Sequence, residues 1–299
     1  MILGLLATVV NAPFALADRM VIGGPTIDPT LGDSDAAAML ASADAGAWDV
    51  VETGLSKVRD PDDYSFLVGC LANAYEDSPN ELDAWVHASP RVGIANTVRG
   101  AAWVLRAWKS RSGMKASMVS RHRWVKFEKA LVQAQDDLFY AAEARAQDAE
   151  PVAWLIPCAM GLPFEDNAEE AKNRHLGAMQ RCPGHTKACR SILTAMCEKW
   201  LGSHERMFAC ANYVISITPE GHPARSVILQ AHIERALYME SWENDEEGAK
   251  AYLRRPEVAQ EIASCANEIE SSRHIAELKN RIEHHSLAAL CLWKAGLYA

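Results

Sequence analysis

Hydrophobic residues recur along most of this chain at the three- and four-residue spacing of amphipathic helices, and from Asp35 onward no segment alternates as a strand would. One apolar stripe predicts a helix over about 94–110 and consists of Ile94, Val98, Ala101, Leu105 and Trp108. A stripe with the same spacing predicts a long helix over about 118–147, and another runs from Ile275 to Leu292 with His285 in it. The pattern indicates an all-α protein.

Prolines divide the second half of the chain into units of similar length. Pro151, Pro183, Pro219 and Pro256 are separated by 32 to 37 residues, and each stands at or near the start of an amphipathic pattern. Proline suits the first helical turn because its missing N–H would have no partner there. A period of roughly 34 residues is typical of stacked helix-turn-helix repeats. We therefore expect an α-solenoid of tetratricopeptide-like helix-turn-helix repeats.

Each of these units is predicted to hold a pair of helices. The pairs are 151–161 with 166–181, 184–200 with 204–217, and 223–240 with 244–254, and a last unit begins at Pro256. Shorter helices are expected at 35–45, 48–58 and 63–76. The elements predict two parts: an irregular or apolar N-terminal lead-in over 1–34 and a single helical-repeat domain over 35–299.

The net charge of −9 and the sequence pI of about 5.6 argue against general binding to nucleic acid or to anionic membranes. One segment departs from this balance, because residues 91–129 carry ten basic residues against one acid, Glu128. It is either a solvated surface complemented by acidic neighbours such as those in 240–247, or a patch for a phosphate, an acidic peptide or a negatively charged partner. In the second interpretation, Arg121 and Arg123 contact the partner.

Eight cysteines are spread mostly through apolar helical patterns, and no C-x-x-C motif occurs. They are typical of buried small hydrophobic residues in a reducing compartment, which predicts a cytoplasmic protein. Export is an alternative, because Met1–Val10 is apolar and Ala15-Leu16-Ala17 resembles a signal-peptide cleavage site. No Lys or Arg precedes that apolar run, and Asn11 and Pro13 interrupt it. No other stretch is long and apolar enough to span a membrane.

The most specific local motif lies at a predicted corner between two helices. It reads Lys199-Trp200-Leu201-Gly202-Ser203-His204-Glu205-Arg206-Met207-Phe208. Gly202 is expected to end one helix, and the Ser203 hydroxyl is expected to cap the next by accepting an N–H from residue 205 or 206.

Two interpretations of this corner stay open. In the first, Trp200 and Phe208 belong to the core, and Glu205 complements the dipole at the start of a helix. In the second, His204 and Glu205 face the concave surface, where they bind a ligand or move a proton, and His232 of the next repeat approaches them.

The corner segment is similar to a K-W-x-G-S-H-E-x-M-F segment in a group of uncharacterised bacterial helical-repeat proteins. A second stretch resembles a degenerate tetratricopeptide unit and includes Pro151-Val152-Ala153-Trp154, Glu169-Glu170-Ala171 and Cys182-Pro183-Gly184-His185. The resemblance covers about 80–240 and implies a tetratricopeptide-like fold. Because that group has no assigned activity, the resemblance implies no catalytic residue.

The chain lacks the sequence frameworks of common enzyme classes. It has no G-x-G-x-x-G after a strand, no P-loop, no G-x-S-x-G and no H-E-x-x-H. Cys182, His185 and Cys189 form a C-x2-H-x3-C pattern, to which Cys197 or His204 would add a fourth ligand. Structural zinc sites usually show tighter paired spacings. We therefore predict no metal and no cofactor.

Two functions are consistent with these patterns. The repeat period and the missing catalytic frameworks favour a non-enzymatic interaction module whose concave groove binds a protein or peptide, with Arg121, Arg123 and the Trp200–Phe208 corner as contacts. The alternative is an enzyme of unfamiliar type, acting in specialised metabolism, with a small-molecule pocket around His204, Glu205 and His232. That alternative requires the three side chains to meet near one point.

Overall fold

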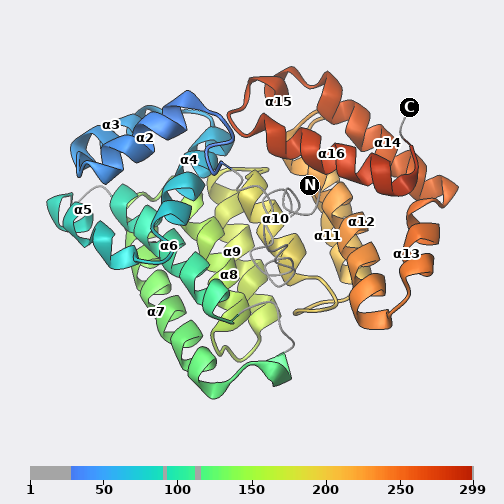
Figure 1. The fold of residues 1–299 in the computed structure, drawn as a ribbon, viewed down its shortest axis with the longest axis horizontal. Coiled ribbons are helices and arrows are strands. Elements are labelled where there is room, and N and C mark those ends of the chain that lie inside the picture. The colour runs from blue at the N-terminus through green and yellow to red at the C-terminus, as the bar shows by residue number, and fades with distance from the viewer. Residues whose placement is uncertain (1–27, 90–92, 112–115, 298–299) are drawn as a thin grey trace.

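The computed structural model describes residues 28–89, 93–111 and 116–297, and within these ranges every regular element is a helix (Figure 1). The all-α prediction is confirmed, whereas the possible signal peptide over 1–17 lies outside the described residues. None of the described helices is both long and apolar enough to cross a membrane.

The α-helices are α2 (Ser34–Asp44), α3 (Trp48–Lys57), α4 (Pro61–Ala74), α5 (Asp83–Ala88), α6 (Ile94–Arg111), α7 (Arg121–Ala144), α8 (Glu150–Gly161), α9 (Asn167–Arg181), α10 (Thr186–Ala195), α11 (His204–Ile217), α12 (Val227–Tyr238), α13 (Glu246–Leu253), α14 (Pro256–Ser271), α15 (Arg273–Glu277) and α16 (Arg281–Ala295). Shorter elements are the 3₁₀-helices η1 (Pro79–Leu82), η2 (Ala116–Met118) and η3 (Pro223–Ser226) and the π-helix η4 (Met239–Glu243).

Several helices begin where local sequence signals predict. The Asp60 carboxylate accepts the backbone N–H groups of Asp62 and Asp63 at 2.9 and 3.2 Å, and Pro61 occupies the first turn of α4. The Ser203 hydroxyl accepts the N–H of Arg206 at 3.1 Å, which confirms the predicted cap of α11. These caps fix where a helix starts and therefore which of its residues face inward.

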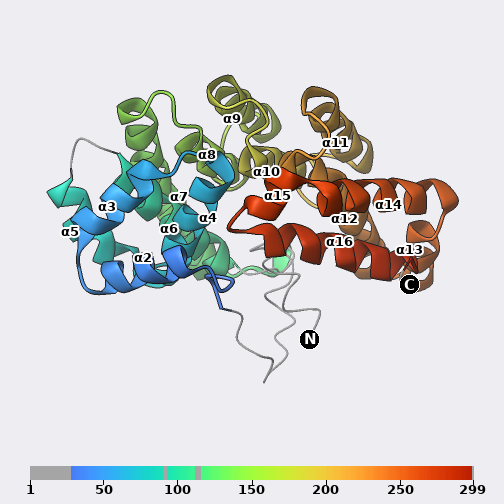
Figure 2. The same cartoon turned by 90° about the horizontal axis from the view of Figure 1, so that it is seen from above.

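Helices that are close in the chain pack side by side. Helix α6 lies along α7, α8 along α9, and α14 along α16, whereas α4, α6, α8, α10 and α12 form a row in which each contacts the next (Figure 1 and Figure 2). Within the described residues, one hydrophobic core extends from Ala36 to Met196 and a second from Cys189 to Ala295. Helix α10 contributes to both cores.

The double role of α10 follows from its sequence. Ala188 and Ile192 belong to the first core, whereas Cys189 and Leu193 belong to the second. Residues four apart lie above one another on a helix, so the two pairs form neighbouring rows that face different cores. The remaining side of α10 is polar.

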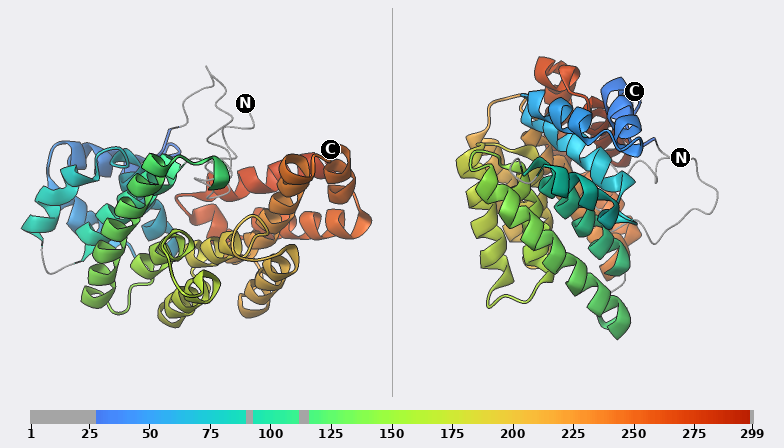
Figure 3. Two further views of the ribbon diagram at one scale, coloured as in Figure 1. Left: turned by 90° about the horizontal axis from the view of Figure 1, so that it is seen from below. Right: turned by 90° about the vertical axis from the view of Figure 1, so that its left-hand side faces the viewer.

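The first and last parts of the described chain lie against each other. His274 Nε2 is 2.8 Å from an Asp60 carboxylate oxygen, and the backbone N–H of Lys279 donates to Asp63 at 2.8 Å. The Lys279 ammonium also pairs with Asp33, which caps α2, and with Asp35 in the first turn of α2. In the right view of Figure 3 the blue and red helices accordingly occupy the same side of the molecule. The row of helices is therefore closed by α15 and α16 returning to α2 and α4.

Two predicted elements are shorter than expected. The helix predicted over 184–200 ends at Ala195, because the chain then turns tightly and the N–H of Leu201 bonds to the carbonyl of Ala195. Gly202 approaches this turn so closely that a Cβ atom there would lie 2.0 Å from the Met196 carbonyl oxygen. Of the helix predicted over 223–240, only Val227–Tyr238 is α-helical. It is preceded by the 3₁₀-helix η3 and followed by the π-helix η4 from Met239.

The prediction that His285 lies in the last apolar stripe is wrong. A break between α15 and α16 interrupts the stripe and changes which face of α16 points inward. His284 is fully buried as a result, whereas the side chain of His285 is 39% exposed.

The fold predicts opposite effects for two helical Gly→Ala substitutions. A Cβ at Gly161 would lie 2.4 Å from side-chain atoms of Leu131 and Phe127, both buried in the first core, whereas a Cβ at Gly69 in α4 would have no neighbour within 4 Å. We expect Gly161→Ala to lower the free energy of unfolding by about 1–3 kcal/mol through overpacking. Gly69→Ala should raise it by about 0.5–1 kcal/mol, because alanine favours the helix. Urea denaturation of both variants tests this; a shift of the same sign in both would contradict the packing of α8 on α7.

Candidate ligand-binding cavity

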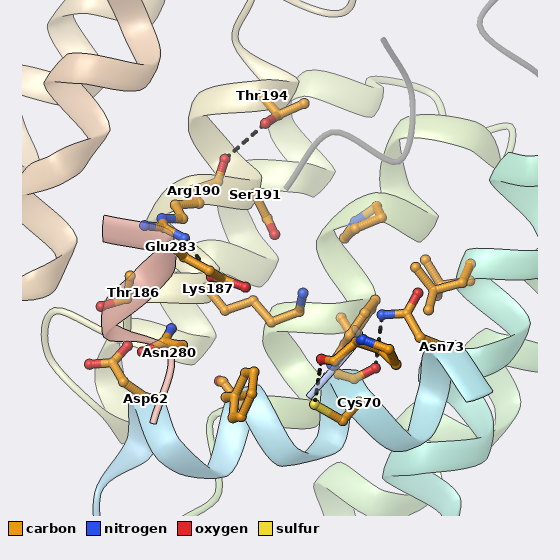
Figure 4. A pocket seen from close by; sticks show the side chains of 18 of the residues that line it. Asp62, Cys70, Asn73, Thr186, Lys187, Arg190, Ser191, Thr194, Asn280 and Glu283 are labelled. Carbon is orange, nitrogen blue, oxygen red and sulfur yellow. Dashed lines mark hydrogen bonds and ion pairs between the residues drawn. The ribbon is translucent and has the colours of Figure 1, made fainter. Parts of the chain in front are cut away.

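A cavity of about 390 Å³ lies among α4, α6, α8, α10 and the start of α16 (Figure 4). Its lining combines apolar and polar side chains, as small-molecule sites commonly do. The apolar lining residues include Phe66, Cys70, Val104, Leu105, Trp154, Pro157 and Met160. The polar lining residues include Asp62, Ser65, Asn73, Thr186, Lys187, Arg190, Ser191, Thr194, Asn280 and Glu283.

Two helices each present one face to this cavity. On α10 the lining residues Lys187, Arg190, Ser191 and Thr194 follow the i, i+3, i+4, i+7 spacing of a single helical face. Helix α4 contributes Asp62, Ser65, Phe66, Gly69, Cys70 and Asn73 with the same alternation of three and one. The opposite faces of both helices are apolar and buried, so core packing directs these side chains into the cavity.

Lys187 extends from α10 into the space between the helices (Figure 4). Its Nζ lies 3.4 Å from the ring centroid of Trp154, a cation–π contact, and among the described residues it has neither a hydrogen-bond acceptor nor an ion-pair partner. Burial lowers the pKa of Lys187 to about 8; the negative charges of Glu150 and Glu283 oppose this shift, and Arg190 adds to it. The ammonium is therefore a cation that the protein leaves available to a ligand.

Glu150 lies directly behind the cavity wall and is fully buried. Its carboxylate accepts hydrogen bonds from Trp154 Nε1 at 2.7 Å and from the Ser65 hydroxyl, and His185 Nε2 is 3.3 Å away. Burial opposes its ionisation, but the hydrogen bond and charge of His185, the charge of Lys187 and the Ser65 hydroxyl together lower the pKa of Glu150. The carboxylate therefore holds a negative charge beside the cavity.

Arg190 forms a second buried charged group. Its guanidinium lies 3.6 Å from a carboxylate oxygen of Glu283, donates to the Ser226 hydroxyl at 3.2 Å and contacts His284 Nδ1 at 3.3 Å. His284 Nδ1 accepts in this contact, because a guanidinium group can only donate. Unlike Lys187, Arg190 is thus satisfied by the protein itself.

Two acids that line the cavity have raised pKa values. Burial raises the pKa of Asp62 above its usual value, although the nearby Thr186 side chain and the charge of His185 partly counteract it. Burial likewise raises the pKa of Glu283, against the opposing charges of Arg190 and Lys187. The cavity consequently holds a base with a lowered pKa and acids with raised pKa values, the combination that proton transfer requires.

The residues predicted at the helix corner lie elsewhere, and none of them lines the cavity. His204 Nε2 is 2.9 Å from a guanidinium nitrogen of Arg235, and Glu205 is exposed. His232 contacts the Tyr252 hydroxyl at 2.7 Å and Glu261 at 2.8 Å, so the two histidines bond to different partners.

Aromatic contacts hold the rest of this corner. The ring of Phe208 is 5.1 Å from that of His232, and the ring of Trp200 is 5.3 Å from that of Trp108. Trp200 also lies against the Arg111 guanidinium at 4.9 Å. Together with the Ser203 cap, these contacts give the corner a structural role that needs no ligand.

The basic segment is divided between paired and exposed residues. Lys109 pairs with Glu76 and Asp77, and Arg99 pairs with Asp83 and Asp137, whereas Arg121 and Arg123 are exposed at the start of α7. The acids in 240–247 were expected to complement the segment, but those that form ion pairs do so with other residues: Glu240 with Lys294, Glu243 with Arg235, and Glu247 with Lys250.

The C-x2-H-x3-C residues have separate environments. His185 faces Glu150, and the thiol of Cys189 contacts the Met179 sulfur at 3.8 Å. Among the described residues, one group could bring three metal-ligating atoms within 4.8 Å of one another, namely Asp60, Asp62 and His274. Asp60 already accepts two backbone N–H groups and contacts His274.

The cavity residues were not identified from the sequence. The available signal was charge within otherwise apolar segments: Glu150 directly precedes an apolar run, and Lys187 and Arg190 share a face of an amphipathic helix. That signal cannot show that residues nearly one hundred positions apart, such as Lys187 and Glu283, share one cavity.

Residues 43–164 match a family described as a domain of unknown function (DUF4034). The match includes α3 to α8 and thus the cavity residues on α4, α6 and α8, whereas Lys187, Arg190 and Glu283 lie beyond it. No curated protein matches the chain. No solved structure matches it either.

Glu150→Gln tests the charge behind the cavity wall. Because the folded protein lowers the pKa of Glu150, its ionised form stabilises the fold at neutral pH, and this stabilisation disappears as pH falls through the folded-state pKa. We expect the variant to lose about 3 kcal/mol or more of unfolding free energy at pH 7 and to approach the wild type at acid pH. Denaturation at several pH values measures the difference, with Glu169→Gln, whose side chain is 58% exposed, as control. A deficit that stays constant down to acid pH would contradict the assignment.

Proposed function

We propose that this protein is a tetratricopeptide-like helical-repeat binding protein whose inner cavity holds a small molecule with an anionic group. The observation that carries the proposal is the Lys187 ammonium, which projects into the cavity without an acceptor among the described residues. Two other cations that are buried or half-buried have such partners, Arg190 with Glu283 and Lys199 with Glu234. A ligand carboxylate or phosphate would complete the same pattern for Lys187.

The repeat architecture is supported by sequence and packing together. The proline period of 32 to 37 residues sets the length of the units, and consecutive helices such as α8 and α9 lie side by side. The cysteines, all of them free thiols and most of them buried, support the proposed reducing, cytoplasmic location.

The closure of the helical row favours a small molecule over an extended peptide. Contacts of His274 and Lys279 hold α15 and α16 against α2 and α4, and Asn280 and Glu283 next to them form one wall of the cavity. A volume of about 390 Å³ is near the lower limit for ligand sites, which span roughly 300–1,000 Å³.

Several features of the cavity match an anionic ligand. With a pKa of about 8, Lys187 is mostly protonated at neutral pH, and a buried charge interacts more strongly than one in water. The Ser191 hydroxyl lines the cavity one turn from Lys187 and has no hydrogen-bond partner among the described residues. Gly69 also lines the cavity and, without a side chain, leaves space there for the ligand. Alanine at this position would favour the helix and would meet no steric obstacle.

Lys187→Met tests the proposed binding. Titration calorimetry with acetate, pyruvate and inorganic phosphate at low ionic strength should detect binding of at least one of them to the wild type. We expect the variant to bind that ion about ten- to one-hundredfold more weakly, since a charged hydrogen bond contributes about 1.5–3 kcal/mol. Ser191→Trp should abolish binding by filling the cavity, and Lys250→Met, at an exposed lysine, should leave it unchanged. Equal affinities in Lys187→Met and Lys250→Met would contradict the proposal.

A second candidate function, contact with an acidic protein partner, is favoured by the start of α7. Arg121, Arg123, Lys126 and Lys129 are exposed there, and none has an ion-pair partner among the described residues. Positive charge near a helix N-terminus is unfavourable because it opposes the helix dipole. An acidic surface of another protein would offset that repulsion.

The double variant Arg121→Glu/Arg123→Glu tests this contact. Affinity purification from the native host at low salt should recover an acidic protein with the wild type, and the charge reversal should reduce its yield at least tenfold. Arg273→Glu, at a side chain 91% exposed on another helix, is the matched control. Equal recovery by the wild type and the double variant would contradict a role for this surface.

A further inference from the structure

We infer that Lys187 is a nucleophile that condenses with the carbonyl group of a cavity ligand, a small aldehyde or 2-oxo acid, to form an imine. The inference rests on the proposed function, because the carbonyl compound must first occupy the cavity. It goes further in assigning a covalent step and a chemical class of ligand.

The first argument is the contrast between two half-buried lysines of the same chain. Lys199 forms an ion pair with Glu234, which occupies its ammonium and favours the charged form. Lys187 meets only the face of Trp154 and the open cavity. An amine without a fixed acceptor is free to approach a carbonyl carbon, whereas an amine held by a carboxylate is not.

The second argument is the protonation state of Lys187, since only a neutral amine attacks a carbonyl. With a pKa of about 8, about a tenth of the Lys187 side chains are neutral at pH 7. For an ordinary lysine the neutral fraction is roughly three in ten thousand. The charged groups around Lys187 are Glu150 on α8, Glu283 on α16, Arg190 on α10 and Asp62 on α4, so its protonation depends on several elements.

The reaction balances with groups already present. Neutral Nζ attacks the carbonyl carbon to form a C–N bond, the carbonyl oxygen takes up a proton, and the nitrogen loses one, which gives a carbinolamine. A protonated carboxyl then donates to the hydroxyl, water leaves, and the C=N bond forms. Asp62 suits the donor role, because it lines the same cavity, forms no ion pair with another described residue and has a pKa raised by burial. No oxidant, reductant or cofactor is required.

The walls restrict the ligand to a narrow class. The charged fraction of Lys187 attracts an anionic group, and in a 2-oxo acid the carboxylate is bonded directly to the carbonyl carbon. Phe66, Leu105 and Met160 also line the cavity and suit a short apolar substituent. A 2-oxo acid with a small hydrocarbon side chain therefore satisfies both the charged and the apolar residues of the lining.

Reductive trapping tests the inference on the full chain. The protein is incubated with pyruvate, or with glyoxylate as a second probe, in the presence of cyanoborohydride, and the modified lysines are located by peptide mass spectrometry. We expect reduction to a stable secondary amine at Lys187, at least tenfold faster than at Lys250, with no modification of Lys199. The rate should rise with pH around a midpoint near 8.

Three variants separate covalent chemistry from binding. Lys187→Arg keeps the cation but has no nucleophilic amine, so it should bind pyruvate in calorimetry without being trapped. Ser191→Trp should prevent both. Glu283→Gln removes a carboxylate that raises the pKa of Lys187, so its trapping profile should shift to lower pH.

The possible results are distinguishable. If wild type and Lys187→Arg both bind pyruvate but the wild type is not trapped at Lys187, the covalent inference is overturned and the binding function stands. Trapping at equal rates on Lys187 and exposed lysines also overturns it. If the wild type neither binds the small anions nor is trapped, the proposed function and the inference fail together.

Discussion

The structure depends on one short helix that must satisfy two hydrophobic cores and a set of buried charges at once. Helix α10 places Ala188 and Ile192 in one core and Cys189 and Leu193 in the other, which leaves its third side for Lys187 and Arg190. Charged groups are costly to bury without partners, so the elements that pack against this third side must supply polar or oppositely charged groups. Arg190 is satisfied by Ser226 before α12 and by Glu283 and His284 on α16, and these contacts tie the C-terminal helices to α10.

The same requirement explains why Lys187 is unusual. Glu150 has its own hydrogen bonds from Trp154 and Ser65, and Glu283 is oriented toward Arg190, so neither carboxylate forms an ion pair with the lysine. Both are close enough to influence its pKa, yet burial has the larger effect and brings that pKa to about 8. An apolar side chain at this position would cost less free energy to bury than a lysine, so stability alone does not account for Lys187. An open, polar-lined cavity beside it is therefore better explained by a ligand than by stability.

Local features of the fold were predictable from the sequence, whereas the site was not. The Ser203 cap and the bounds of α11 follow from interactions within a few residues, and such interactions are encoded in short segments. The early end of α10 at Ala195 could not be foreseen, because it depends on Gly202 approaching the Met196 carbonyl. The adjacent His204 and Glu205 at the 200–208 corner indicated a possible site because they are neighbours in the sequence. The cavity instead combines Ser65, Lys187 and Glu283, which only the closure of the helical row brings together.

That closure also limits what the cavity can do. An open helical row offers a groove along its whole length, but here the contacts of Lys279 with Asp33, Asp35 and Asp63 hold the last helices against the first. Glu283 lies four residues after Lys279, in the first turn of α16, so the same contacts place its carboxyl beside Arg190. The acid on the cavity wall and the enclosure of the cavity are thus produced by one set of interactions. Loosening them would admit a larger ligand and, at the same time, remove from the cavity a carboxylate that raises the pKa of Lys187.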